Sequence, residues 1–269
     1  MLLRTIVAFI LLPVLFLILF FFPPLVLAIA IAVVSMIAVY ELLWSTGFIR
    51  NATLVGFSCF VSGLVPIWVY YGSRMLPSLT GIFIYVFVVF TVGMVMPKRL
   101  PFGKISGMFF STFVVPYFLS TLLLIYNMEY GVYLIVIPFI AAWVTDSAAY
   151  FIGTIFGKTK LLPAVSAKKT VEGSIGGIIS SVIAELLYGL VLLLFFKIEA
   201  NLPLLGLCGF IGSFAAQAGD LSMSLVKREF HIKDYGNILP GHGGVLDRFD
   251  SVLFVAPAMA IAIQLVTII

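Results

Sequence analysis

Apolar residues run along this chain in long blocks that approach the length of a bilayer-spanning helix. A helix crosses the hydrocarbon core with about 20 predominantly apolar residues. Stretches of about that length or close to it number nine: about 3–22, 24–45, 53–71, 79–96, 105–126, 132–156, 173–196, 202–226 and 246–268. The alternating segments of roughly ten residues that a transmembrane barrel requires are not visible. The pattern therefore predicts an all-α, polytopic integral membrane protein with about nine transmembrane helices.

Composition agrees with this prediction. The chain is 63% hydrophobic and 10% charged, with a mean hydropathy of +1.25, whereas soluble domains are about 45–50% apolar. These values exclude a soluble globular protein, make membrane lipids the first expected partners and give no reason to expect a nucleic-acid partner. No small-residue cleavage site follows the first block, and Pro23 and Pro24 lead directly into the second. We therefore expect the first block to be a retained span and not a signal peptide.

The basic residues predict the orientation in the membrane. Under nine spans, one side carries only Arg74 and Lys197. The other side carries thirteen cations: Arg4, Arg50, Lys98, Arg99, Lys104, Lys158, Lys160, Lys168, Lys169, Lys227, Arg228, Lys233 and Arg248. Loops rich in Lys and Arg stay in the cytoplasm. We therefore expect a multi-pass protein of the inner cell membrane with a cytoplasmic N-terminus, an external C-terminus and an active site that faces the cytoplasm.

The chain divides by chemistry near residue 130. Residues 1–130 contain large apolar side chains and almost no intramembrane charge, which indicates a scaffold of hydrophobic helices, lipid contact or an interface of a homo-oligomer. Residues 131–269 contain every candidate intramembrane acid: Asp146, Glu185, Asp220 and Asp250. Ionisable groups inside a bilayer are costly and are functional candidates by default. We expect the C-terminal part to be the catalytic region.

One candidate phosphate site precedes the seventh predicted span. Lys168, Lys169 and Thr170 stand just before a helix that opens with Glu172 and several small residues. The free N–H groups of a helix N-terminus, with lysines beside them, suit an anion. The alternative is a helix cap next to lysines that only set the topology.

The polar segment Ser224–Asp250 holds the densest candidate chemistry. Asp247 and Asp250 are three residues apart and share a helix face, and Asp220 lies at the end of the preceding span. Carboxylates that converge in this way suit Mg²⁺. Asp146 is a weaker fourth candidate ligand, and the pattern leaves a second metal ion open. The alternatives are structural ion pairs between Asp220 and Lys227 or Arg248, and between Asp146 and a nearby lysine.

Cations and glycines accompany these acids. Gly243 and Gly244 belong to a glycine-rich loop whose N–H groups can close on phosphate oxygens, and His242 can donate a proton or a hydrogen bond. The cations that flank this loop suit a polyphosphate: Lys227, Arg228, Lys233 and Arg248. We expect Asp146, Lys168, Asp220, Lys227 and Asp247 to line one cavity.

The segment resembles, position by position, the signature of the phosphatidate cytidylyltransferases, or CDP-diacylglycerol synthases. About fourteen positions match within 27 residues: Ser224, Lys227, Arg228, Lys233, Asp234, Gly236, Leu239, Pro240, His242, Gly243, Gly244, Asp247, Arg248 and Asp250. Two further blocks are similar to the family, around Asp146–Lys158 and Ser166–Gly173. One minor departure is Ala167, where the family usually has proline. The resemblance is close over roughly residues 140–250.

The resemblance implies that CTP and phosphatidic acid condense, with Mg²⁺, to CDP-diacylglycerol and pyrophosphate. It implies metal binding by Asp220, Asp247 and Asp250, with Asp146 as a fourth ligand, and charge neutralisation by Lys227, Arg228 and Arg248. Lys168 and Lys169 would hold a substrate phosphate. The alternatives are a related CTP-dependent lipid enzyme, such as a polyprenol kinase or an ether-lipid cytidylyltransferase, an ion-coupled transporter or a non-catalytic scaffold.

Overall fold

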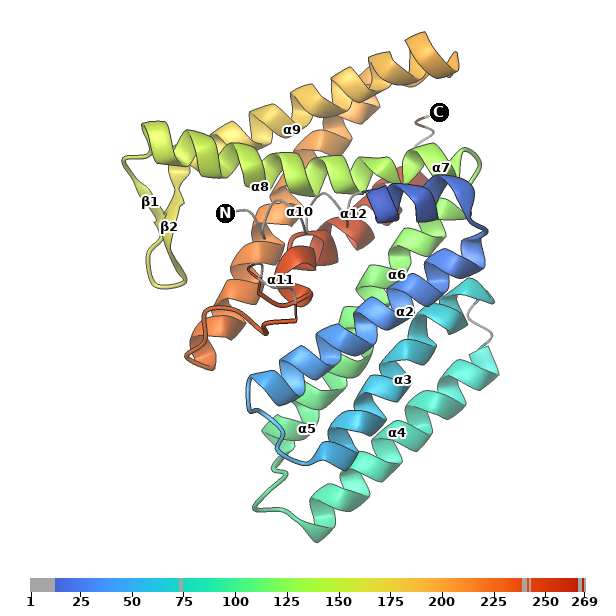
Figure 1. Cartoon of the computed structure of the whole chain (residues 1–269), viewed down its shortest axis with the longest axis vertical. Helices are drawn as coiled ribbons and strands as arrows, with labels where there is room; N and C mark the ends of the chain where they lie inside the picture. The colour runs from blue at the N-terminus through green and yellow to red at the C-terminus, as the bar shows by residue number, and fades with distance from the viewer. Residues whose placement is uncertain (1–12, 73–74, 239–240, 242, 266–267, 269) are drawn as a thin grey trace. The chain divides into compact units, whose positions relative to one another are not determined.

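The computed structural model describes residues 13–72, 75–238, 241, 243–265 and 268 (Figure 1). Within these residues the regular secondary structure is helical apart from one two-stranded hairpin. The described helical stretches that are long and apolar enough to cross a membrane number seven: Pro24–Ser45, Ala52–Tyr70, Leu76–Val95, Phe102–Tyr126, Gly131–Phe156, Val171–Phe196 and Leu202–Glu229. The prediction of an all-α, multi-pass membrane protein is confirmed.

The first and last of the nine expected spans differ from the other seven. Half of 3–22 lies outside the described residues, and residues 13–21 are helical. The expected span 246–268 is interrupted, because a turn at Asp250 and Ser251 separates α11 (Leu246–Phe249) from α12 (Val252–Leu265). The 14 residues of α12 are fewer than the roughly 20 that a straight span needs. The polar run at the start of this block, where the Asp250 side chain accepts a hydrogen bond from the Ser251 N–H, accounts for the break.

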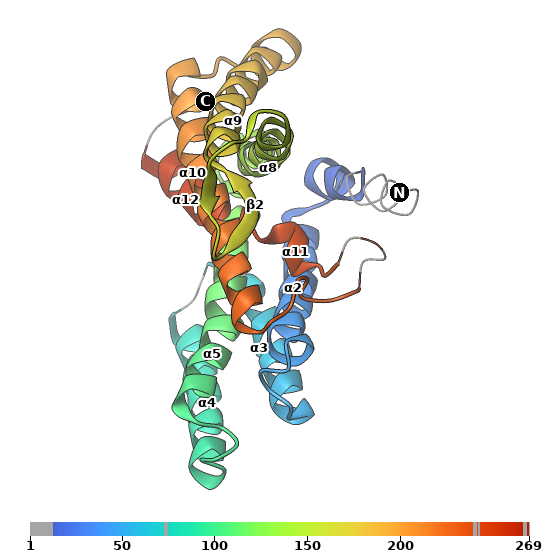
Figure 2. The same cartoon turned by 90° about the vertical axis from the view of Figure 1, so that its left-hand side faces the viewer.

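The helices pack into two compact units, and the first consists of residues 1–124 and 230–248. Its helices are α2 (Pro24–Tyr40) with a π-helical end η1 (Glu41–Ser45), α3 (Ala52–Tyr70), α4 (Met75–Val95), and α5 (Phe102–Phe109), which continues through η2 (Phe110–Val114) into α6 (Val115–Tyr126). Helices α2, α3 and α4 lie side by side (Figures 1 and 2). The buried Tyr85 hydroxyl shares hydrogen bonds of 2.9 Å with Ser58 and with Thr112, which links α4 to α3 and η2.

The second unit consists of residues 125–229 and 249–269. It contains α7 (Gly131–Leu134), α8 (Val136–Phe156), β1 (Lys160–Leu162), β2 (Ser166–Thr170), α9 (Val171–Val191) with η3 (Leu192–Phe196), α10 (Leu202–Glu229) and α12. Helix α8 packs most extensively against α9, and α10 contacts α8, α9 and α12. A Cβ at Gly173 would lie 2.6 Å from the Ala149 carbonyl oxygen, so only glycine permits this close approach of α9 to α8. The antiparallel β1–β2 hairpin connects these two helices (Figure 1).

The units divide the chain close to the expected boundary near residue 130, with one difference. The segment Phe230–Arg248, which contains much of the polar signature, packs with the N-terminal helices. Residues 131–269 are therefore not one compact body, although the assignment of catalysis to this region stays a prediction. The reason for the difference is a buried acid on the second predicted span, described below.

Candidate functional site

A cavity of about 560 Å³ in the second unit collects several of the expected residues. Its lining includes Asp146 from α8, Lys168, Lys169 and Thr170 from β2, and Asp220 from α10. These residues come from three blocks that are far apart in the sequence. The cavity therefore joins the lysine pair to two of the four predicted metal ligands, whereas two of the five residues expected to line it, Lys227 and Asp247, are not among its lining residues.

The Asp220 carboxylate lies at the centre of the polar contacts in this cavity. Its Oδ2 atom forms an ion pair with the Lys169 ammonium group, and its Oδ1 atom accepts a hydrogen bond of 3.3 Å from the Ser224 hydroxyl. The side chains of Lys169 and Asp220 are 22% and 24% exposed. Water reaches both partners, and ion pairs of this kind contribute little to stability. An incoming phosphate can therefore replace Asp220 as the partner of Lys169.

The start of α9 holds the lysine-bearing strand in place. Thr170 caps the helix by accepting a hydrogen bond of 3.2 Å from the Gly173 N–H at its side-chain oxygen. The Glu172 carboxylate accepts hydrogen bonds of 3.1 Å from the N–H groups of Lys158 and Thr159, which directly precede β1 at the open end of the hairpin. The helix cap that was the alternative to a phosphate site is therefore present, and it holds the strand that presents Lys168 and Lys169.

A second pair of charges lies at the end of α10. The Lys227 ammonium nitrogen is 3.5 Å from Oδ2 of Asp250, and Lys227 is only 9% exposed. The Ser251 hydroxyl donates a hydrogen bond of 2.5 Å to Oδ2 of Asp146. The carboxylates of Asp146 and Asp220 are near enough to Asp250 to repel its negative charge. Three carboxylates thus share one neighbourhood with two lysines.

The oxygen donors of Asp146, Asp220 and Asp250 fit Mg²⁺, a hard cation that prefers carboxylate oxygens. Within the described part of the chain, no three side chains of His, Cys, Asp or Glu lie close enough together to hold a metal ion by themselves. Magnesium ions are commonly held by one or two carboxylates together with water and substrate phosphates. The donor set therefore fits a metal that arrives with a phosphate-bearing substrate.

In the first unit, Asp247 orders the backbone of the signature segment. Its Oδ2 atom accepts hydrogen bonds of 2.8 Å from the Tyr235 N–H and 2.9 Å from the Gly244 N–H. Asp247 is 7% exposed. Gly243, which has a φ of +83°, takes the left-handed conformation that glycine adopts without strain. Asp247 therefore has a structural task in addition to the expected metal binding.

The Glu41 side chain, which is fully buried at the end of α2, binds the same segment. Its carboxylate accepts hydrogen bonds of 2.9 Å from the Val245 N–H and 2.8 Å from the Leu246 N–H. A Cβ at Gly244 would lie 2.6 Å from both carboxylate oxygens of Glu41. Only glycine fits at that position while the carboxylate stays in place.

The remaining predicted residues that the structure describes are divided between the two units. Lys233 and Arg248 are exposed in the first unit. The Arg228 guanidinium in the second unit donates from Nε to the Val165 carbonyl oxygen at 3.2 Å, which connects α10 to the turn of the hairpin. His242 lies outside the described residues.

Sequence reasoning missed Glu41, which lies near the end of the expected span 24–45 in the part of the chain interpreted as a scaffold. The sequence does contain a signal: Glu41 is the only Asp or Glu before Glu129. A single acid in an apolar region is costly unless it has partners. Its partners are backbone N–H groups. Because every residue except proline has such a group, the sequence does not indicate which of them bind Glu41.

Comparison with known proteins places these residues in a family. A sequence model described as "Cytidylyltransferase family" matches residues 2–266. The chain belongs to the cytidylyltransferase family. It is 47% identical over 131 residues to the phosphatidate cytidylyltransferase of Staphylococcus haemolyticus, over 49% of this chain and 49% of that protein. It is 48% identical over 134 residues to the phosphatidate cytidylyltransferase of Bacillus subtilis, over 48% of this chain and 46% of that protein. The chain spans about half the length of the curated relatives it matches.

Proposed function

We propose that this protein transfers a cytidylyl group from CTP to phosphatidic acid and so produces CDP-diacylglycerol and pyrophosphate for phospholipid synthesis. A phosphate oxygen of phosphatidic acid attacks the α-phosphorus of CTP. The bond from that phosphorus to the oxygen bridging to the β-phosphate breaks, and pyrophosphate leaves with the bonding electrons. The cavity that joins Lys168, Lys169 and Asp220 carries the proposal, and the named relatives support it.

Electrostatics makes this reaction difficult, because two anions must approach each other. Charges fixed before the reaction lower such a barrier. Lys168 and Lys169 on β2 would hold a substrate phosphate. A phosphate oxygen would then replace Asp220 as the partner of the Lys169 ammonium group. The proposal assigns neutralisation of the triphosphate or of the leaving pyrophosphate to the other cations of the signature: Lys227, Arg228, Lys233 and Arg248.

We assign Mg²⁺ to the acidic residues, with Asp146, Asp220 and Asp250 as a set within one unit. When bound, Mg²⁺ would supply positive charge to the triphosphate oxygens. We also assign Asp247 to metal binding. Because its carboxylate holds the N–H groups of Tyr235 and Gly244, replacement of Asp247 would also disturb the backbone of this segment. Gly243, Gly244 and His242 are assigned to phosphate contact through the same segment.

The proposal also places the active site at the cytoplasmic face of the inner membrane, where CTP is available. The cation distribution supports this orientation. Phosphatidic acid then enters from the bilayer and keeps its acyl chains among lipids. We further propose that the protein forms a homo-oligomer through its apolar N-terminal helices.

Turnover by the purified full chain tests the function. The protein is incubated with CTP, phosphatidic acid and Mg²⁺, and CDP-diacylglycerol is measured. We expect Lys169→Gln to lower kcat/KM by about 100-fold, the cost of removing one preorganised charge contact. Lys197→Gln, an exposed cation outside the cavity, is the matched control and should keep full activity.

Three outcomes would contradict parts of this proposal. Formation of product from a polyprenol or an ether-lipid phosphate, but not from phosphatidic acid, would assign the protein to a related CTP-dependent enzyme. Ion-coupled uptake into liposomes without CTP would indicate a transporter. Full activity in Lys169→Gln would show that the cavity is not the reaction site.

A further inference from the structure

A second cavity, in the first unit, lies outside the acidic site and collects positive charge. It has a volume of about 410 Å³, and its lining includes Arg50, Lys98, Arg99 and Lys104. No Asp or Glu occurs anywhere between Leu42 and Met128. The cations of this cavity therefore have no acidic partner in the sequence that surrounds them.

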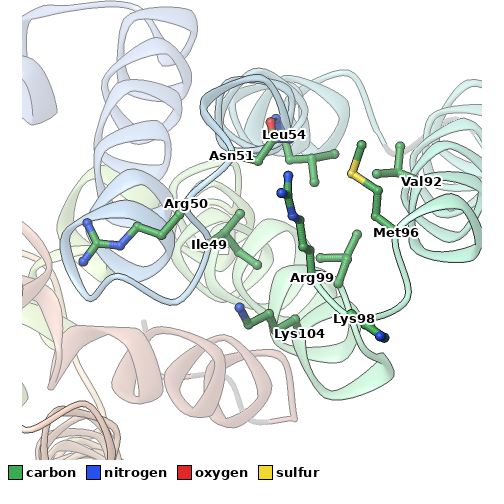
Figure 3. A pocket seen from close by; sticks show the side chains of 10 residues that line it. Ile49, Arg50, Asn51, Leu54, Val92, Met96, Lys98, Arg99 and Lys104 are labelled. Atoms are coloured by element: carbon green, nitrogen blue, oxygen red, sulfur yellow. The ribbon is translucent and has the colours of Figure 1, made fainter.

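The contacts of these cations agree with the sequence. Within the described residues, none of the four side chains makes a hydrogen bond or an ion pair with the protein. Figure 3 shows the Arg99 side chain extended toward Asn51, whereas the Arg50 guanidinium points away. Lys104 is half-buried. Arg99 and Lys104 therefore bring positive charge to this cavity without an acceptor from the described residues, and this arrangement favours an anion that enters from outside the chain.

The apolar part of the lining indicates what kind of anion. Leu54 lies in α3, Val92 lies in α4, and Met96 directly follows α4. Because α3 begins and α4 ends at this cavity, it lies where two consecutive membrane helices meet the water interface. Exposed apolar side chains continue along α4 from there, including Phe87, Phe90 and Met94. Cations beside an exposed apolar helix surface suit an anionic headgroup with acyl chains attached.

We infer that this cavity binds the phosphate of an anionic phospholipid, as a structural ligand that joins the start of α3 to the turn between α4 and α5. The site is separate from the cavity lined by Lys169 and Asp220, and it does not depend on the proposed reaction. Each cation near an anionic headgroup contributes to binding. The loss of Arg99 and Lys104 together should weaken binding by about 30-fold.

The test uses the full chain in a neutral detergent. Native mass spectrometry gives the Kd of each phosphatidylglycerol molecule that binds during a titration. We expect one binding event to weaken by about 30-fold in the double variant Arg99→Gln/Lys104→Gln. The charge-preserving variant Arg99→Lys/Lys104→Arg should retain that event, and so should Lys197→Gln. Phosphatidylcholine should not compete for it.

Thermal unfolding gives a second readout. Phosphatidylglycerol should raise the Tm of the unaltered protein by mass action, and the Arg99→Gln/Lys104→Gln variant should lose most of this increase while keeping its lipid-free Tm. Equal Kd values in the unaltered protein and this variant would overturn the assignment. Binding of inorganic phosphate at the cavity, without any binding of phosphatidylglycerol, would overturn its lipid part.

Discussion

Replacement of Glu41 by Gln tests whether a buried acid of the N-terminal unit orders the signature segment. The carboxylate offers one oxygen to the Val245 N–H at 2.9 Å and the other to the Leu246 N–H at 2.8 Å. A Gln side chain has one oxygen and one NH₂ group. In either rotamer, one backbone N–H therefore faces another donor, and the remaining hydrogen bond has a neutral acceptor.

The size of the effect follows from these two contacts. A hydrogen bond to a charged group contributes about 1.5–3 kcal/mol. Loss of one bond and weakening of the other should cost the closed segment about 2–3 kcal/mol. Since 1.4 kcal/mol corresponds to a factor of ten, the segment should open about 30- to 100-fold more often.

Amide hydrogen exchange measures this opening directly, because the exchange rate of a protected amide follows the local opening equilibrium. The amides of Val245 and Leu246 should exchange about 30- to 100-fold faster in Glu41→Gln. Glu129→Gln changes an exposed acid and is the matched control. Under the proposed function, Glu41→Gln should also lower turnover. Unchanged exchange at Val245 and Leu246 would refute the reasoning, whatever happens to activity.

Other predictions concern the acids and the topology. Asp247→Asn and Asp250→Asn should each abolish turnover in protein that stays folded in detergent, and near-normal activity in both would contradict the metal assignment. A cysteine introduced in 157–172 should resist a membrane-impermeant reagent added outside the cell, and ready labelling would reverse the orientation. Glu185 is fully buried, and neither carboxyl oxygen has a hydrogen-bond partner within the described residues. Its replacement by Met should stabilise the protein by about 1–3 kcal/mol, whereas a lower Tm would show that the carboxyl group is needed.

The sequence by itself determined the membrane helices and the family. Long apolar blocks cannot stay in water and must satisfy their backbone groups internally in a bilayer, so the blocks from 24–45 to 202–226 correspond to helices in the structure. The spacing of the residues in Ser224–Asp250 sufficed to indicate a cytidylyltransferase, and the match of residues 2–266 confirms the family. Local spacing was enough to indicate the family because the residue types of this motif lie within 27 consecutive positions.

Tertiary structure alone decided which charged groups meet. Lys169 pairs with Asp220, although sequence spacing suggested Lys227 or Arg248 as the partner of Asp220. Glu41 reaches the N–H of Val245, which is 204 residues away, and this contact groups the signature segment with the N-terminal helices. Periodicity shows which side chains share a face of one helix. It does not show which helices pack together, because burial of apolar surface is not directional, and for that reason the partners of the buried acids became visible only in the folded chain.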